Sequence, residues 1–148
     1  MKYFTYDLWI QTNSQDEDTR IKASLEWSRR DKDYLSQFNR VKGFFTKSFI
    51  QSYINYGGFH GGYITSFQFQ AERQRFVISV EYYSHTFQII FDKVNSVVIN
   101  YCKTYDCEWG YSEIDINDAG EHLMNILCSN GQEISICFSR IRIAKSTK

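Results

Sequence analysis

The chain of 148 residues contains no proline. Because X-Pro bonds isomerise slowly, this absence removes a common slow step of folding. Turns must instead be formed by glycine, asparagine, aspartate and serine. Long apolar runs are also missing, since the first 11 residues hold only Leu8, Trp9 and Ile10 in a row, too few for a signal peptide. No later segment reaches membrane-spanning length, so we expect a cytoplasmic protein without membrane contact.

Metal-binding patterns are missing as well. The spacing of Cys102 and Cys107 is wider than in common zinc sites, and no second pair complements it. The three histidines, His60, His85 and His122, also lack a ligand at a typical spacing. We therefore predict no metal and no other cofactor. A chain without an export signal belongs in a reducing compartment, so we expect four free thiols, at Cys102, Cys107, Cys128 and Cys137.

Lysine and arginine are absent from residues 104–139, although the whole chain carries no net charge. Seven acids lie in this segment: Asp106, Glu108, Glu113, Asp115, Asp118, Glu121 and Glu133. Such asymmetry is typical of a surface that meets a basic partner, and nearby aromatic side chains would anchor that partner. The candidate partner-binding residues are Asp106, Glu108, Trp109, Tyr111, Glu113, Asp115, Asp118 and Glu121.

The first third of the chain has the pattern of helices. A capping-box sequence at residues 14–17 predicts a helix over residues 15–29. Asp31 would cap a second helix over residues 32–55, which would end at residues 57–58, because two glycines readily form a left-handed cap. Apolar residues three and four apart predict a buried stripe on this helix, made of Tyr34, Leu35, Phe38, Val41, Phe45, Phe49 and Tyr53.

After Gly62 the apolar residues alternate with polar ones. Residues 63–69 and 76–82 are predicted to pair as a β-hairpin. Further strand-like runs follow at residues 87–91, 97–101, 109–111, 123–128 and 134–138. Strands that follow one another without helices form antiparallel sheets. We therefore predict a single α+β domain over residues 1–148, with N-terminal helices (14–56) packed on a mainly antiparallel sheet of about six or seven strands (63–143).

Enzymatic and nucleotide-binding patterns are weak. The glycine-rich residues 57–62 follow a helix and precede a strand, which is the reverse of the order in phosphate-binding loops. His60 lies in this segment and is a loop candidate, because loops often carry functional sites. No serine lies in a Gly-x-Ser-x-Gly elbow. Glu113 and Asp115 would share one strand face, and we interpret them as solvated surface rather than as an acid/base pair.

Aromatic residues make up 18% of the chain, which raises the question of base stacking. Proteins that bind single strands in this way also need a cationic groove. Only three bases, Arg73, Arg75 and Lys93, lie between residues 57 and 96. We therefore predict no nucleic-acid binding and expect the phenylalanines of the strands to form the core, at Phe67, Phe69, Phe76, Phe87 and Phe91.

Several short motifs resemble an uncharacterised bacterial family known as domain of unknown function 4085. They are the opening residues 1–5, Phe59-His60 before a strand, and the segments 109–114, 121–127, 134–136 and 141–143. The family pattern has an aspartate where this chain has Gly61. The resemblance implies no activity, because the family has none assigned. The turn into a β-rich half also resembles small immunity proteins of bacterial toxin systems, which is a fold-level analogy.

These observations favour a non-enzymatic protein-binding domain. The specific hypothesis is an immunity or antitoxin-like inhibitor whose acidic, aromatic-bearing face docks on a basic toxin domain. The alternative is a small enzyme or ligand-binding domain that uses His60, His122 and Glu113. Convergence of those side chains in a deep pocket would favour the alternative, and a flat acidic face would favour the inhibitor. An adaptor protein is a third possibility.

Overall fold

The computed structural model describes residues 1–100 and 107–147. Three α-helices come first, namely α1 (Tyr6–Thr12), α2 (Glu17–Val41) and α3 (Lys47–Asn55). Eight strands are then described: β1 (Gly62–Gln70), β2 (Arg75–Tyr82), β3 (His85–Asp92), β4 (Ser96–Ile99), β5 (Glu108–Ile116), β6 (His122–Cys128), β7 (Glu133–Phe138) and β8 (Arg140–Thr147). All belong to one antiparallel sheet of order β4-β7-β6-β5-β1-β2-β3-β8. The α+β fold class is confirmed.

The predicted number of strands was too low because β8 was not recognised. Its short apolar alternation, Ile141 and Ile143, lies among the basic residues of the tail. Backbone pairing with β3 makes it a strand, with Ile143 opposite Ile89 and Arg140 opposite Asp92. An edge strand of this kind is determined by its neighbour more than by its own pattern.

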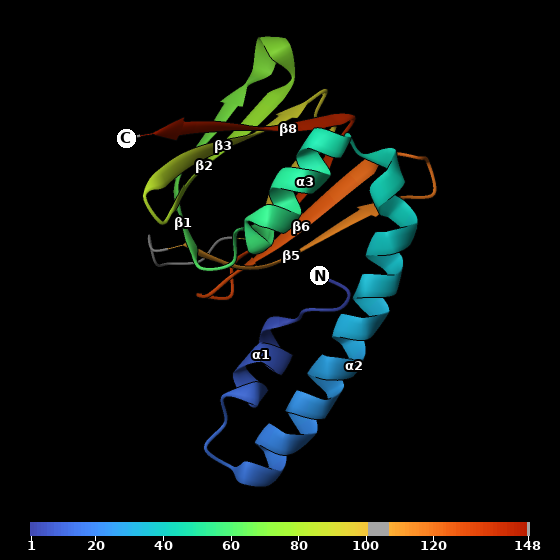
Figure 1. The fold of residues 1–148 in the computed structure, drawn as a ribbon, viewed down its shortest axis with the longest axis vertical. Helices are drawn as coiled ribbons and strands as arrows, with labels where there is room; N and C mark the ends of the chain where they lie inside the picture. Colours follow the sequence, from blue (N-terminus) through green and yellow to red (C-terminus); the bar gives the residue numbers. More distant parts are fainter. Residues whose placement is uncertain (101–106, 148) are drawn as a thin grey trace.

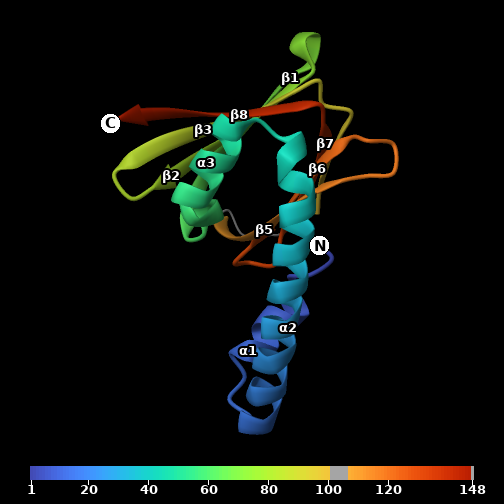
Figure 2. The ribbon, with the colours of Figure 1, turned by 45° about the vertical axis from the view of Figure 1, so that its right-hand side comes forward.

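The helices form an arm and a cover for the sheet (Figures 1 and 2). In both views α1 and the first half of α2 lie side by side and project away from the sheet, whereas α3 packs against it. Leu8 of α1 and Ala23 of α2 are buried in the arm. The helical region therefore has two roles, because α3 packs on the core, whereas α1 and the first half of α2 project away from the sheet.

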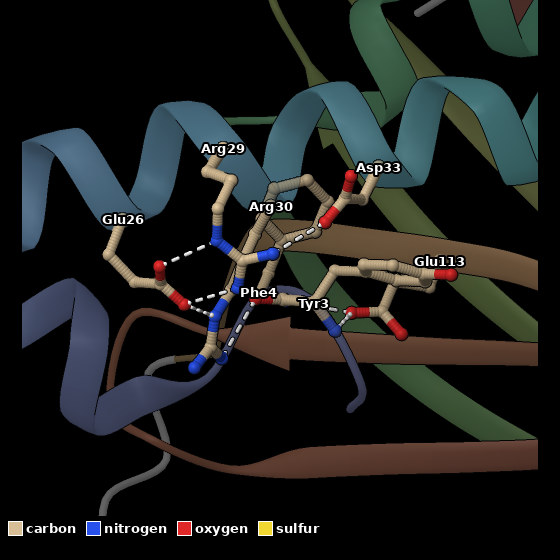
Figure 3. Close-up of polar contacts among 7 residues, drawn as sticks. All are labelled: Tyr3, Phe4, Glu26, Arg29, Arg30, Asp33 and Glu113. Atoms are coloured by element: carbon tan, nitrogen blue, oxygen red, sulfur yellow. Dashed lines mark hydrogen bonds and ion pairs between the residues drawn. The ribbon is translucent and has the colours of Figure 1, made fainter.

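The helices differ from the prediction, because α1 lies before the predicted start at residue 14 and the boundaries of the two following helices are different. Asp31 caps no helix, because α2 runs through it without a break. The observed N-cap is Asp16, whose Oδ2 accepts a hydrogen bond of 2.8 Å from the Thr19 amide. Figure 3 shows why the helix continues, since Arg29 bridges Glu26 and Asp33 along its surface. Ion pairs three and four residues apart support a continuous helix.

The break in the helical region lies at residues 42–46 instead. A short 3-10 turn (Lys42–Phe44) ends α2, and Thr46 Oγ1 then accepts a hydrogen bond of 3.3 Å from the Phe49 amide to begin α3. The predicted stop after α3 is confirmed, because Gly57 and Gly58 have φ of 56° and 63°, a conformation that favours glycine.

The core lies between α3 and the sheet. Most of the predicted helix stripe is buried there, namely Phe38, Val41, Phe45, Phe49 and Tyr53, together with the predicted strand residues Phe76, Phe87 and Phe91. Leu35, by contrast, is exposed on α2, and Phe67 and Phe69 are exposed on β1, so those three expectations were wrong. The reason for the last two is that β1 pairs with β5 only through Gly62 and Tyr63. Its second half extends beyond the body of the sheet.

The sheet curls so that its two ends approach each other. The single residue Ser139 connects β7 to β8, although these strands lie near opposite ends of the sheet order. The Ser139 amide donates to Asp92 O at 3.3 Å, and the Asn95 amide donates to Cys137 O at 2.9 Å. The end of β3 and the beginnings of β6 and β8 thereby lie on the same side of the molecule as the start of α3.

The cysteines correct the prediction of four free thiols. Cys107 and Cys128 form a disulfide, with Cα atoms 5.6 Å apart. They meet because β5 pairs with β6, which places Trp109 opposite Cys128. Cys137 is free and buried, and burial raises the pKa of its thiol. Cys102 lies outside the described residues. None of the helices in the described ranges combines the length and the apolar character needed to cross a membrane.

Candidate functional site

Strand β5 carries most of the predicted partner-binding residues, and its register decides which of them reach the surface. A β-bulge interrupts the pairing with β6 between Trp109 and Tyr111. Trp109 is fully buried, with its ring 5.6 Å from that of Phe59. Trp109 is therefore part of the core and cannot contact a partner directly, which corrects its assignment as a surface anchor.

Tyr111 joins the arm to the sheet. Its ring lies 4.7 Å from Trp27, 5.2 Å from Trp9 and 5.3 Å from Phe4, measured between ring centroids. We call these four residues the aromatic joint. Gly110 belongs to the same arrangement, because a Cβ added there would lie 2.7 Å from the Trp9 ring. The Trp-Gly-Tyr motif at residues 109–111 is thus explained by packing, and Tyr111 is only half-buried.

Glu113 is buried, contrary to the expectation of a solvated surface residue. Its carboxylate accepts three backbone hydrogen bonds, from Lys2 at 2.9 Å, Tyr3 at 2.7 Å and Phe4 at 2.8 Å. Figure 3 shows the Tyr3 and Phe4 side of this contact, together with Arg30, which donates to Tyr3 O at 3.4 Å. Glu113 therefore holds the N-terminal segment on the sheet, a structural role that its sequence neighbours give no sign of.

His60 lies in the loop before β1 and is exposed. Its Nδ1 is 2.5 Å from Gly110 O, and its ring is 4.9 Å from that of Tyr111. The next residue, Gly61, has φ of 81° and donates its amide to Trp109 O at 2.8 Å. Glycine adopts this left-handed conformation most easily, and aspartate is among the residues that tolerate it. An aspartate at this position would thus be compatible with the observed turn.

The three residues of the enzyme hypothesis lie in separate places. His60 packs near the start of β5, Glu113 is covered by the N-terminal segment, and His122 begins β6 opposite the end of β5. His122 pairs with Ile116 at the end of β5, and the seven residue steps from Trp109, near its start, to Ile116 span roughly 23 Å. The described geometry therefore does not bring His60, His122 and Glu113 into one pocket.

The predicted acids also divide into separate groups. Glu108 is half-buried at the start of β5, and Asp106 lies outside the described residues. Asp115, Asp118 and Glu121 gather at the opposite end, in and beside the turn between β5 and β6. We call these three residues the acidic turn. The single acidic face expected over the whole segment is thus replaced by one compact group of three carboxylates.

Neutral donors hold the acidic turn in place. Gln37 Nε2 donates to Asp115 Oδ1 at 2.7 Å, and Asn117 Nδ2 donates to Glu121 Oε2 at 2.7 Å. Asn95 Nδ2 also donates to Glu121. Hydrogen bonds from Asn117, Cys137 and Asn95 lower the pKa of Glu121, so it remains ionised at neutral pH. In residues 1–100 and 107–147 no ion pair neutralises any of the three carboxylates.

Two tyrosines connect the helices to the same strand from the core side. The Ile114 amide donates to Tyr34 Oη at 2.9 Å, and Tyr53 Oη lies 2.7 Å from Ser112 Oγ. Burial is the main reason that the pKa of each phenol is raised above its ordinary value of 10.0. The helical stripe is therefore attached to β5 by polar contacts as well as by apolar packing.

This raised pKa predicts alkaline sensitivity. The unfolded chain loses these phenol protons near pH 10.0, whereas the folded protein retains them to higher pH. The contribution of the two phenols to the free energy of unfolding is thus complete below about pH 10. It is lost as the pH rises toward their pKa in the folded protein. We expect urea unfolding at pH 8 to 11 to show a falling free energy of unfolding above pH 10, with a shallower slope in Tyr34→Phe. Tyr63→Phe, at an exposed position, should keep the wild-type slope, and equal slopes in all three proteins would contradict this assignment.

No protein-family model matches the chain, and a search of curated proteins finds no match. The resemblance to the uncharacterised family therefore stays a prediction. In the described part of the chain, no three His, Cys, Asp or Glu side chains are grouped so that they could hold a metal ion.

Proposed function

We propose that the chain is a non-enzymatic protein-binding domain, of the immunity or antitoxin type, which meets a basic partner through the acidic turn. The observation that carries this proposal is that Asp115 and Glu121 are held by amide donors and not by cations. An amide orients a carboxylate without neutralising its charge. The negative charge of the turn is thus retained and stays available for an incoming cationic surface.

The position of the turn supports an encounter role. Asp118 is exposed at the tip of the β5–β6 connection, and Asp115 and Glu121 flank it. Exposed charges act over a Debye length of about 8 Å at physiological ionic strength. A compact group of charges therefore attracts a basic partner more effectively than the same charges spread along a strand.

An apolar anchor is also required, because charge alone contributes more to the association rate than to affinity. Trp109 and Tyr111 are engaged inside the protein. Phe44 takes this role in our proposal, since its side chain is 66% exposed. It lines the same cleft as His122, the residue that follows Glu121. An adaptor would use the same surface and would differ only in the identity of its partner.

The proposal predicts a slower association when the charge of the turn is reversed. After isolation of a partner from native lysate, Asp118→Lys should lower the association rate constant about threefold or more at low ionic strength, because repulsion replaces attraction. Stability should change by less than about 0.5 kcal/mol, since Asp118 is exposed. The rate constants are measured at two salt concentrations.

Glu72→Lys is the matched control, because Glu72 is an exposed acid on the short turn between β1 and β2, away from the acidic turn. It should leave the association rate constant within about twofold of the wild-type value. The proposal fails if the rate constant is insensitive both to salt and to Asp118→Lys, or if Glu72→Lys has an equal effect.

A further inference from the structure

A cleft of about 620 Å³ opens between the start of α3, the end of β3 and the beginnings of β6 and β8. Its floor is apolar and includes Phe45, Phe49 and Ile141, all of them buried. Arg140, Arg142 and His122 lie among the lining residues from the strands. Small-molecule sites typically have volumes of about 300–1,000 Å³ with a mostly apolar lining and a few polar groups. The cleft has both properties.

The charge in this cleft is positive. Asp92 is the acid among its described lining residues, and Arg75 Nε already binds its Oδ1 at 2.5 Å. Arg142 Nε is 3.8 Å from the other oxygen of Asp92. Arg140 is exposed and forms no ion pair within the described ranges. The described lining of the cleft thus contains two guanidinium groups, of Arg140 and Arg142, and one carboxylate, of Asp92, which Arg75 already neutralises from outside that lining.

The cleft also contains two neighbouring rings, those of His122 and Phe45, on which a flat group can pack. The His122 ring lies 4.6 Å from that of Phe45, and His122 Nδ1 is 2.9 Å from Ser139 O. Because a carbonyl oxygen only accepts, Nδ1 carries the proton and donates it, which leaves Nε2 as the nitrogen without this contact. Ser48 and Thr46 add hydroxyl groups from the first turn of α3, where the helix dipole also favours negative charge.

We propose that this cleft binds a small organic anion. Its carboxylate or phosphate group is held by Arg140 and Arg142, because guanidinium groups bind both anions through paired hydrogen bonds. Its apolar body, preferably an aromatic ring, lies against Phe45 and Ile141. The cleft shares Phe44 and His122 with the surface beside the acidic turn, but its ligand is a small anion and not a basic protein, so this proposal goes beyond the proposed partner-binding function.

The first test compares an anion with its neutral analogue on the whole protein. Backbone amide resonances of the unmodified chain are followed by NMR during titration with 4-phenylbutyrate, with phenyl phosphate and with the neutral 4-phenylbutanamide. We expect saturable shifts at residues 45–49 and 140–142 with both anions, and an affinity for the amide lower by about tenfold or more, since a hydrogen bond between charged groups is worth at least that factor. The tighter of the two anions identifies the preferred acidic group.

The second test removes the guanidinium groups. The double variant Arg140→Gln, Arg142→Gln should bind the preferred anion about tenfold or more weakly, whereas Arg73→Gln, at the exposed turn between β1 and β2, should bind it as the wild type does. A thermal melt confirms that each variant is folded. Equal affinity for the anions and the amide, no saturation up to about 10 mM, or unchanged binding by the double variant would each overturn the proposal. The comparison of anion with amide needs no variant and decides the matter even if the double variant does not fold.

Discussion

Replacement of Glu113 by alanine is expected to lower the free energy of unfolding by about 3–5 kcal/mol, because it leaves three backbone donors without an acceptor. The variant would leave the amides of Lys2, Tyr3 and Phe4 without their common acceptor. Each unsatisfied buried donor costs about 1–3 kcal/mol, and partial access of water to the first two reduces the total. Urea unfolding monitored by circular dichroism measures the change.

Two further variants test whether the loss of stability comes from the acceptor oxygens of Glu113 or from removing an acid from β5. Glu113→Gln keeps one acceptor oxygen and should cost about 1–3 kcal/mol. Asp115→Ala removes a half-buried acid two residues later on the same strand and should cost about 1 kcal/mol, because Gln37 can turn to water. Equal losses for Glu113→Ala and Asp115→Ala would show that the N-terminal segment is not held by Glu113.

Phe49→Ala is the second substitution with a large expected effect, a loss of about 3–5 kcal/mol. Phe49 is 1% exposed, and its ring lies 5.7 Å from Phe45 and 5.6 Å from Tyr53. Truncation would leave a cavity between α3 and the sheet, which the surrounding aromatic rings can fill only in part.

Phe44→Ala provides the matched control for Phe49→Ala, because it removes the same side chain at an exposed position before α3. It should change the free energy of unfolding by about 0.5 kcal/mol or less. Differential scanning calorimetry of both variants is sufficient. A melting temperature that falls equally in the two proteins would contradict the assignment of Phe49 to the core and Phe44 to the surface.

The buried stripe of the helical region and the hairpins were predictable because their signals are local. Apolar residues three and four apart identified Phe38, Phe45 and Phe49 as one buried face. Asn-Gly is a favoured hairpin turn, and residues 130–131 form the turn between β6 and β7, where Gly131 has φ of 85°. In each case neighbouring residues in the chain contain the whole pattern.

The placement of the candidate site was predictable only in part, because it depends on distant segments. The sequence shows that residues 104–139 are acidic, and this segment includes the turn at Asp118. It does not show that the N-terminal segment covers Glu113, or that a bulge directs Trp109 into the core. Nor does it show the cleft, since Arg140, His122 and Phe45 meet only after the sheet has curled.

The Glu113 contact also has a consequence for the order of events during synthesis. Tyr3 and its acceptor are 110 residues apart in sequence. Residues 2–4 leave the ribosome well before Glu113, so they must remain without this contact until β5 has been synthesised and has paired with its neighbouring strands. Contacts of such high sequence separation form late, because closing a long loop costs chain entropy that only the other contacts of the folded structure offset. The beginning of the chain is thus expected to be among the last parts of the protein to be locked in place.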